Sequence, residues 1–584
     1  MPIKTVYTWL PVTVAMYPET VPIVGEHDFG KVASIPEHLP HSTASNTSLP
    51  LRLHTEGHGI DKYPAKVHAR RVAEELGDVK GLIVLAAAQS ILWPDSDMPQ
   101  PFRQDRYFYY LSGCNEPGCY VTYDLQRDVL TLWLPTINKT RVVWQGRGST
   151  VEEALEKYDI DEAKYLTHET MEPRIVRRGH QPSRHNRDLL INYICSITGH
   201  SDEVAALSSE HLYCDRLVSK FCPKHQRKNL RYAIDTCRVI KDEHEINLTR
   251  KANNTTAAGH EAVLQHLHQL TNEAEVEAEY MRICIAHHAK EQAYSPIAGS
   301  GPNAGVLHYV ANNERFGDRK MMVLDAGCEV SCYASDVTRT LPLNRKKPGH
   351  WPSKECENVY RVVEGVQEAC IALMKPGNSF RDIAWHATNM TTRGLLDLGV
   401  LKGDCEEVLA QGTWRAFFPH GLGHHMGLEV HDVSPGPRPK EDSSKSMSVE
   451  DSHIAVLPPS WQLMSSWLAT ETLPTSTSGA RPDYALLKPG MIITVEPGIY
   501  FNSFLLENFF LNDPKHAQFI DKEVLERYMD VGGVRIEDDI LVTKDGYENL
   551  TVAPKGEAML QCIRRGAEEA ARRERGEMYR EAMP

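Results

Sequence analysis

Residues 418–432 have the sequence FPHGLGHHMGLEVHD, with histidines at His420, His424, His425 and His431. These imidazoles are separated by glycines, which let the backbone turn tightly and bring rings close to a ligand. A flexible His-rich loop is the simplest alternative. Apolar residues also occur in the stretch, at Leu422, Met426, Leu428 and Val430. The pattern therefore indicates a packed loop that presents imidazole groups.

Two aspartates lie upstream of this loop. Asp325 ends the apolar run 321–324 and precedes Ala326-Gly327, and Asp336 follows eleven residues later. If the two segments pair as antiparallel strands, both carboxylates reach one site. A buried pair of carboxylates repels unless it is protonated or bound to a cation. Asp before Ala-Gly is also a common turn former, so the pair alone does not define a metal site.

Two glutamates lie downstream. Glu496 follows the apolar strand 492–495, and Glu537 lies in the stretch GGVRIEDD at 532–539. Each acid alone is typical of a solvated strand end. Together with the aspartates and one histidine they give the order Asp, Asp, His, Glu, Glu. Such oxygen-rich donors suit Mn²⁺, Co²⁺ or Zn²⁺ better than a thiolate zinc site does.

These stretches resemble the metal motifs of the Xaa-Pro aminopeptidase and prolidase family, which has the pita-bread fold. Fungal-type Xaa-Pro aminopeptidases are the most similar. The resemblance covers about Ala233 to Thr551, and the upstream stretch FRQDRYFYYLSG at 102–113 resembles the family's N-terminal domain. Helices and strands alternate in blocks. The expected fold is α+β, with an N-terminal mixed α/β domain followed by a C-terminal pita-bread catalytic domain.

The resemblance implies a role for each candidate metal ligand. Asp325 binds one metal ion, His424 binds the other, and Asp336 and Glu537 bridge them. Glu496 is both a ligand and the acceptor of a proton from a bridging water. The implied cofactors are two divalent ions per subunit, Mn²⁺ first, with Co²⁺ or Zn²⁺ as alternatives.

Four further residues match substrate-site positions of the family. His431 corresponds to the histidine that contacts the substrate carbonyl, and His308 corresponds to a second substrate-site histidine. His420 and Arg535 match positions on the proline side of the cleft. Packing or support of the metal ligands is the alternative interpretation of all four.

The implied function is release of the N-terminal residue from peptides with proline in the second position. Two metal ions activate a bridging water, and Glu496 passes a proton to the leaving nitrogen. A prolidase restricted to Xaa-Pro dipeptides is the nearest alternative, and the motifs do not separate the two. The upstream domain favours the Xaa-Pro aminopeptidase over the prolidase. It also fits a methionine aminopeptidase poorly. An inactive binding protein on the same fold is expected to lack metal ligands, whereas all five are present.

The chain has 584 residues, which predicts more than one domain. Residues 1–60 are rich in Pro, His, Ser and Thr and predict a loosely ordered extension. Residues 61–230 form the expected N-terminal domain and residues 231–552 the metallopeptidase domain. Residues 553–584 read as a charged, solvated helical tail.

The segment 434–487 is unusual because it mixes Ser, Thr and Pro with apolar residues such as Trp461 and Trp467. It separates His431 from Glu496 by more residues than the family requires. Two interpretations stay open: the segment is a genuine insertion, or the gene model wrongly includes it. A genuine insertion would form a surface excursion near the mouth of the active site.

Local patterns predict several elements of the N-terminal domain. Residues 65–76 read as a helix, residues 81–86 as a buried strand and residues 108–111 as another strand. Residues 119–123 and 130–134 flank a turn and predict a hairpin.

Composition limits the class of protein. A net charge of -14 argues against nucleic-acid binding, which needs an excess of Lys and Arg. The N-terminal residues predict no signal peptide, and no apolar run is long enough to span a membrane. The 13 cysteines are scattered, which fits reduced thiols and a cytoplasmic location. Peptide substrates are the expected partners, with a homodimer as a further possibility.

Overall fold

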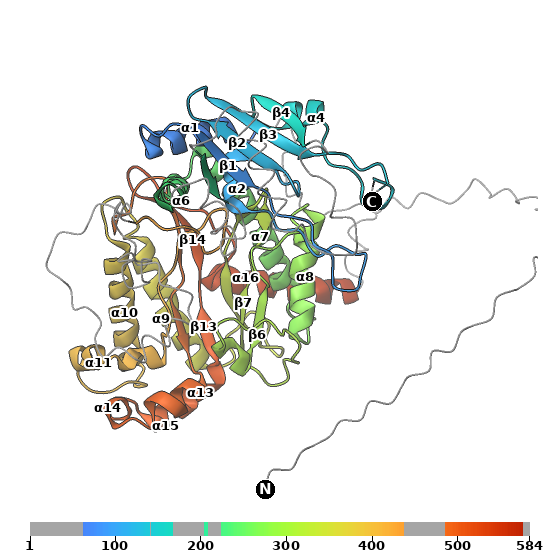
Figure 1. Cartoon of the computed structure of the whole chain (residues 1–584). Coiled ribbons are helices and arrows are strands. Elements are labelled where there is room, and N and C mark those ends of the chain that lie inside the picture. Colours follow the sequence, from blue (N-terminus) through green and yellow to red (C-terminus); the bar gives the residue numbers. More distant parts are fainter. Residues whose placement is uncertain (1–61, 141, 167–203, 208–223, 437–484, 576–584) are drawn as a thin grey trace, which may run out of the picture. The chain divides into compact units, whose positions relative to one another are not determined.

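The computed structural model describes residues 62–140, 142–166, 204–207, 224–436 and 485–575 (Figure 1). The expectations for residues 1–60 and for most of the segment 434–487 therefore lie outside the described residues. Everything from residue 61 onward clusters into one compact unit.

The N-terminal domain is built on a five-stranded sheet in the order β4-β3-β2-β1-β5. β2 pairs antiparallel with both β1 and β3, so the predicted hairpin is confirmed, while β4 and β5 add parallel strands at the edges. The strands are β1 (Leu82–Ala86), β2 (Tyr120–Asp124), β3 (Val129–Pro135), β4 (Glu162–Leu166) and β5 (Val204–Leu207). The helices are α1 (Ala65–Leu76), as predicted, α2 (Arg106–Ser112), α3 (Val142–Gln145) and α4 (Val151–Lys157).

The prediction of a strand at 108–111 is wrong, because these residues form helix α2. The Asp105 side chain accepts the Phe108 N–H and caps the first turn, and Gly113 ends the helix with a φ of 62°. Every side chain of α2 is buried. Aromatic residues are enriched in strands, but this preference depends strongly on context. Here the caps at Asp105 and Gly113 favour the helix.

The catalytic part combines long helices with short antiparallel sheets, which agrees with the α+β expectation. The sheets have the orders β10-β7-β6, β11-β14-β15, β12-β13 and β8-β9. The first two contain β6 (Ile297–Ser300), β7 (Met321–Asp325), β10 (Thr338–Pro342), β11 (Ile492–Val495), β14 (Asp538–Val542) and β15 (Tyr547–Asn549). The shorter pairs contain β8 (Glu329–Val330), β9 (Tyr333–Ala334), β12 (Gly498–Tyr500) and β13 (Gly533–Arg535).

Helices flank these strands on two sides. Figure 1 shows β6, β7 and β13 between α9 and α10 on one side and α7 and α8 on the other. The main helices are α6 (Lys224–Val239), α7 (Glu243–His266), α8 (Glu273–Ala286), α9 (Lys354–Ile371), α10 (Phe380–Asp397) and α11 (Cys405–Gln411). Shorter helices are η3 (Gly301–Gly305), η4 (Thr413–Ala416), α13 (Ser503–Leu505), η7 (Leu506–Phe510), α14 (Pro514–Ala517), α15 (Lys522–Tyr528) and η8 (Met529–Val531).

The C-terminal helix α16 (Gly556–Glu574) differs from the expected solvated tail. Met559 and Ile563 on one face are buried in the main hydrophobic core. At Gly566, a Cβ atom would lie 2.0 Å from the carbonyl oxygen of Gln265 in α7, so the two helices approach closely. The charged residues of α16 therefore occupy one face only, and the other face belongs to the catalytic core.

Two further expectations concern cysteines and membranes. The ten cysteines within the described ranges carry free thiols, and all except Cys405 are buried. In that same part of the chain, the helices are too short or too polar to cross a bilayer.

Candidate metal centre

Asp325 and Asp336 come together because β7 and β10 run antiparallel, with Thr338 opposite Asp325. The hydroxyl oxygen of Tyr294 lies 2.6 Å from Asp325 Oδ1 and 2.5 Å from Asp336 Oδ1. The two aspartates thus share one buried site, as the sequence pattern requires.

The other three candidate ligands converge on Asp336. Ligand atoms of Asp336, His424 and Glu537 all lie within 4.8 Å of one another. The Nε2 atom of His424 is 3.4 Å from Asp336 Oδ2 and 3.4 Å from Glu496 Oε1. The structure therefore brings all five sequence-predicted ligands into one cluster, with Asp325 joined through Tyr294.

Backbone contacts with β11 hold His424 in place. The His424 N–H donates to the hydroxyl of Thr494 at 3.0 Å, and the Thr494 N–H donates to the His424 carbonyl at 2.9 Å. At Gly423, a Cβ atom would lie 2.0 Å from the Thr494 carbonyl oxygen, so only glycine permits this approach. The histidine loop thus lies directly against the strand that ends at Glu496.

The protonation state of His424 suits a metal ligand. Its Nδ1 lies 3.1 Å from the carbonyl oxygen of His425, which requires the proton on Nδ1. Burial lowers the pKa of His424 to about 4, so the ring is neutral at physiological pH. The lone pair on Nε2 then points toward the carboxylates, which is the arrangement metal-binding histidines use.

The carboxyl groups repel one another. Burial, followed by the charge of neighbouring carboxylates, raises the pKa of Asp336, Glu496 and Glu537 well above the ordinary range. Without a cation these groups retain protons that a bound divalent ion would displace. Carboxylate oxygens with one neutral imidazole nitrogen match the donor set of Mn²⁺, Co²⁺ or Zn²⁺, so the residues present fit a metal centre.

Arg535 links the cluster to His420. Its Nη2 donates to Asp325 Oδ2 at 2.6 Å, and its Nη1 donates to the Tyr500 hydroxyl at 2.9 Å. His420 donates through Nδ1 to the Gly421 carbonyl at 2.7 Å and accepts the Tyr500 hydroxyl proton on Nε2 at 2.8 Å. Burial lowers the pKa of His420 to about 3, which keeps the ring neutral. Both predicted proline-side residues therefore belong to one hydrogen-bonded chain that ends on a metal ligand.

His431 and His308 lie at the solvent-exposed rim of the cluster. The ring of His431 is 4.3 Å from that of His424, centroid to centroid, at an interplanar angle of 70°. The nearby His424 ring, followed by partial burial, lowers the pKa of His431 to about 3. Partial burial and the charge of Arg535 lower the pKa of His308. Both rings are thus neutral groups that face the space above the ligands.

A cavity of about 630 Å³ lies beside His431. Arg103 of the N-terminal domain donates to Glu329 at 2.8 Å and to Glu429 at 2.6 Å, and Arg106 donates to Glu329 at 2.5 Å. Arg103, Arg106 and Glu429 line the cavity together with His431. The N-terminal domain therefore supplies one wall of the space next to the predicted site.

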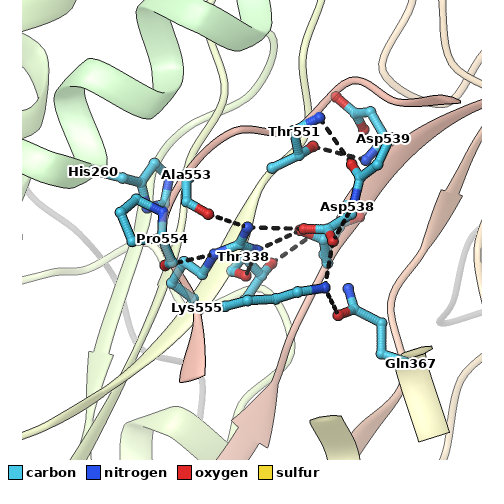
Figure 2. A network of polar contacts seen from close by, with 12 residues as sticks. His260, Thr338, Gln367, Asp538, Asp539, Thr551, Ala553, Pro554 and Lys555 are labelled. Atoms are coloured by element: carbon cyan, nitrogen blue, oxygen red, sulfur yellow. Dashed lines mark hydrogen bonds and ion pairs between the residues drawn. The ribbon is translucent and has the colours of Figure 1, made fainter. Parts of the chain in front are cut away.

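Asp538 follows Glu537 and lies in a polar network with Lys555 (Figure 2). Its Oδ1 lies 2.8 Å from Arg339 Nη2, and its Oδ2 accepts from Lys555 Nζ at 2.7 Å. Arg339 also donates to the Glu537 backbone carbonyl at 2.8 Å. Burial raises the pKa of Asp538, but the two cations outweigh it and hold the pKa below its ordinary value. This ion pair anchors the backbone of a candidate ligand.

Asp539 returns to the ligand side, as alternation along β14 requires. Its Oδ2 accepts the Asp336 N–H at 3.0 Å and the Asn253 side-chain amide at 2.8 Å. The hydroxyl of Thr338 donates to Glu537 Oε2 at 2.7 Å. Each bridging candidate therefore has a dedicated partner that fixes its orientation.

Sequence reasoning missed these supporting residues. The run Glu537-Asp538-Asp539 signalled a concentration of charge but not which acid faces the cluster. Tyr294 and Lys555 carry no local signal, because their partners are far away in the sequence.

A second group of potential ligands, His68, Asp242 and Glu245, also lies within 4.8 Å. Asp242 and Glu245 form the capping box of α7, and His68 binds Asp242 through Nε2 at 2.8 Å. These acids therefore already have structural partners.

Comparisons with known proteins identify relatives of the whole chain. The sequence model of metallopeptidase family M24 matches residues 247–544, and that of the aminopeptidase P N-terminal domain matches residues 68–179. A probable Xaa-Pro aminopeptidase of Aspergillus clavatus is 44% identical over 520 residues, covering 89% of this chain and 96% of the relative. One from Pyrenophora teres f. teres is 47% identical over 87% of this chain, which spans only 51% of that relative's length.

Solved structures give the same result. Aminopeptidase P from Escherichia coli with the inhibitor Pro-Leu matches 87% of this chain and 100% of its own, with a TM-score of 0.63 and 25% identity. A Zn-substituted form of that enzyme in complex with product has a TM-score of 0.62 and 25% identity, over 86% and 99% of the two chains. The expected pita-bread architecture with its N-terminal domain is therefore confirmed, and the chain belongs to the Xaa-Pro aminopeptidases of metallopeptidase family M24.

Proposed function

We propose that this chain releases the N-terminal residue from peptides with proline in the second position, using two divalent metal ions, preferentially Mn²⁺. The observation that carries the proposal is the convergence of Asp336, Glu496 and Glu537 on His424, whose neutral ring offers Nε2 as a ligand. Asp325 joins this cluster through Tyr294. Asp325, Asp336, Glu496 and Glu537 would hold the ions with His424. When bound, such ions act as Lewis acids that polarise a carbonyl group and ease deprotonation of water.

The protein's own groups then bind the peptide and move protons. Glu496 is half-buried at the end of β11 and would accept the proton that the attacking water loses. We assign it transfer of that proton to the leaving nitrogen of proline, which as a tertiary amide has no proton of its own. His431 and His308 would orient the substrate carbonyl. Arg535 and His420, fixed through Tyr500, would bound the proline side.

A prolidase, which acts on Xaa-Pro dipeptides only, remains the nearest competing function. The match of the aminopeptidase P N-terminal domain to residues 68–179 favours the aminopeptidase over the prolidase. The test compares an Xaa-Pro dipeptide, an Xaa-Pro-Yaa tripeptide and an Xaa-Ala-Yaa tripeptide under Mn²⁺. Cleavage of the Xaa-Pro-Yaa peptide is expected, with little cleavage after replacement of proline by alanine. Cleavage of the dipeptide alone would assign a prolidase.

Metal number and identity need a separate measurement. Elemental analysis of purified protein is expected to give two equivalents of metal per chain, with the highest activity after reconstitution with Mn²⁺. One equivalent, or higher activity with Zn²⁺ or Co²⁺, would contradict this part of the proposal.

We also propose that the protein acts in the cytoplasm as a homodimer. Val143 and Trp144 on α3 are each 84% exposed, which is unusual for apolar side chains of this size and favours a protein contact. Sedimentation of the purified protein tests this, and a monomer at micromolar concentration would contradict it.

A further inference from the structure

The segment between β6 and β7 carries His308 but has little regular structure. After Ser300 the chain forms η3 and then runs without a further helix or named strand to Met321. Backbone and side-chain polar groups in such a segment need partners outside regular ladders. Whatever supplies those partners also determines where His308 lies.

One buried carboxylate supplies several of them. Glu273 is the first residue of α8, and its side chain is fully buried. Six donors from residues 300–319 reach this single group. They are the Ser300 N–H at 2.8 Å, the Ser300 hydroxyl at 2.7 Å, the Asn303 amide at 3.0 Å, Arg319 Nη1 at 3.2 Å, the Tyr309 hydroxyl at 2.8 Å and the Glu314 N–H at 2.9 Å.

These donors keep Glu273 ionised. Burial raises the pKa of its carboxyl, but the hydrogen bonds from Asn303 and the other donors lower the pKa below its ordinary value. The N-terminus of α8 also favours an anion at this position. Hydrogen bonds to a charged acceptor are stronger than those to a neutral one, so the carboxylate holds the segment tightly.

Other contacts fix the segment on both sides of His308. The Asn312 side-chain amide donates to Glu277 Oε2 at 2.9 Å. The Asn502 amide donates to the Gly305 carbonyl at 2.9 Å. Between these points, the His308 ring makes no hydrogen bond to another residue in the described part of the chain, so its place depends on the backbone that carries it.

We propose that Glu273 is a positioning residue, which holds the segment 300–314 so that His308 faces the metal cluster. The link is short, because Tyr309 is adjacent to His308 and donates its hydroxyl proton to Glu273. The segment lies against the strand that carries Arg535, because a Cβ atom at Gly305 would lie 3.0 Å from the carbonyl oxygen of Gly532, the residue before β13. The inference rests on the proposed substrate-site role of His308.

A double-mutant cycle tests the inference with an Xaa-Pro-Yaa substrate. Glu273→Gln places an amide group against donors and removes the charge. We expect kcat/KM to fall by about 10- to 100-fold, the range for residues that orient a catalytic group. In a His308→Ala background, the same change is expected to lower kcat/KM by no more than about threefold, because the group it positions is gone.

The matched control is Glu275→Gln. Glu275 lies in the same first turn of α8, but its carboxylate binds Thr271 instead of the His308 segment. The kcat/KM of this variant should stay within about twofold of wild type, as expected for a surface substitution away from the core and from buried polar networks. Tyr309→Phe is the milder variant if Glu273→Gln does not fold. It should lower kcat/KM several-fold in wild type and leave it unchanged in the His308→Ala background.

The possible failures differ from one another. If Glu273→Gln or Tyr309→Phe lowers kcat/KM by the same factor with and without His308, the carboxylate acts generally and the positioning role is wrong. Wild-type activity in both variants would also overturn it. If His308→Ala alone retains wild-type activity, the substrate-site role of His308 in the proposed function fails, and the positioning inference fails with it.

Discussion

The buried acids Asp336 and Glu537 of the candidate metal centre differ in one respect from Asp538 and Asp432, two equally buried acids outside the ligand cluster. Asp336 and Glu537 have no cationic side chain as a hydrogen-bond or ion-pair partner within the described residues, and burial with mutual repulsion raises their pKa values. Asp538 and Asp432 have cationic partners, which hold their pKa values below the ordinary range. Asp432 pairs with Arg238 at 2.6 Å and with Lys241 at 3.0 Å.

This difference separates acids that are available to bind metal from acids that support the fold. Asp538 and Asp432 already have cations and stabilise the fold. Asp325 combines both situations, because Arg535 donates to its Oδ2 while its Oδ1 lies beside Tyr294 in the cluster. An acid without a cationic partner destabilises the fold until a cation arrives, so metal binding and stability are coupled. Residues adjacent in sequence, such as Glu537 and Asp538, thus have opposite energetic roles.

Of the changes predicted, removal of metal should have the largest effect on activity and stability. Dialysis against a chelator is expected to reduce Xaa-Pro-Yaa hydrolysis by at least about a thousandfold, because the Lewis acids that stabilise the transition state are lost. The midpoint of thermal unfolding should fall as well, because an ion that binds only the folded state stabilises it. Addition of Mn²⁺ should restore both. Full activity in protein shown by elemental analysis to be metal-free would refute the metal centre.

Asp336→Asn should separate activity from stability. We expect kcat/KM to fall at least about a hundredfold through loss of a ligand. In chelator at pH 8, however, the variant should be more stable than wild type. Wild type must bury a carboxyl that is ionised in the unfolded chain, whereas the amide is neutral in both states. Thermal unfolding in chelator measures this. A less stable metal-free variant would mean that Asp336 has a compensating partner and belongs with the supporting acids.

Asp538→Asn should have the opposite pattern. Arg339 and Lys555 lose their opposing charge, and Arg339 is almost fully buried. Breaking such a pair costs about 3–5 kcal/mol of unfolding free energy. Denaturant unfolding with and without metal should show this loss in both states. Glu153→Gln is the control, because its partner Arg147 and Glu153 itself are both exposed and no change in midpoint is expected.

His260 should produce a smaller, pH-dependent effect. It lies on α7 behind the cluster, with Nε2 3.1 Å from the Ala326 carbonyl, and burial lowers its pKa to about 4. Since the unfolded chain binds this proton at higher pH, the associated stability is complete above about pH 6.5 and is lost as the pH falls toward 4.

The measurement is denaturant unfolding in chelator between pH 4 and 6.5, for wild type and His260→Gln. The variant should have a shallower dependence of unfolding free energy on pH, by at most about 1.4 kcal/mol per pH unit for a single group. Parallel curves for the two proteins would show that His260 does not titrate in this way.

Local patterns predicted much of the site, for identifiable reasons. Asp325 and Glu496 each end an apolar strand, and strand ends are visible in a short window of sequence. The glycines around His424 signalled a close approach, which proves to be that of Gly423 to Thr494. The wrong prediction of a strand at 108–111 has an equally local cause. The prediction followed the aromatic run and overlooked Asp105, which caps the helix.

The amino-acid sequence by itself determined the donor set, its order and most of the elements that carry it. Only the tertiary structure decided which acid meets a cation. Strand alternation separates Glu537 from Asp538, but Arg339 and Lys555 reach Asp538 through pairing and packing of distant segments. The same holds for Glu273, whose six donors come from residues 300–319. Charge and burial act over a few ångströms in space, and no short stretch of sequence contains both partners.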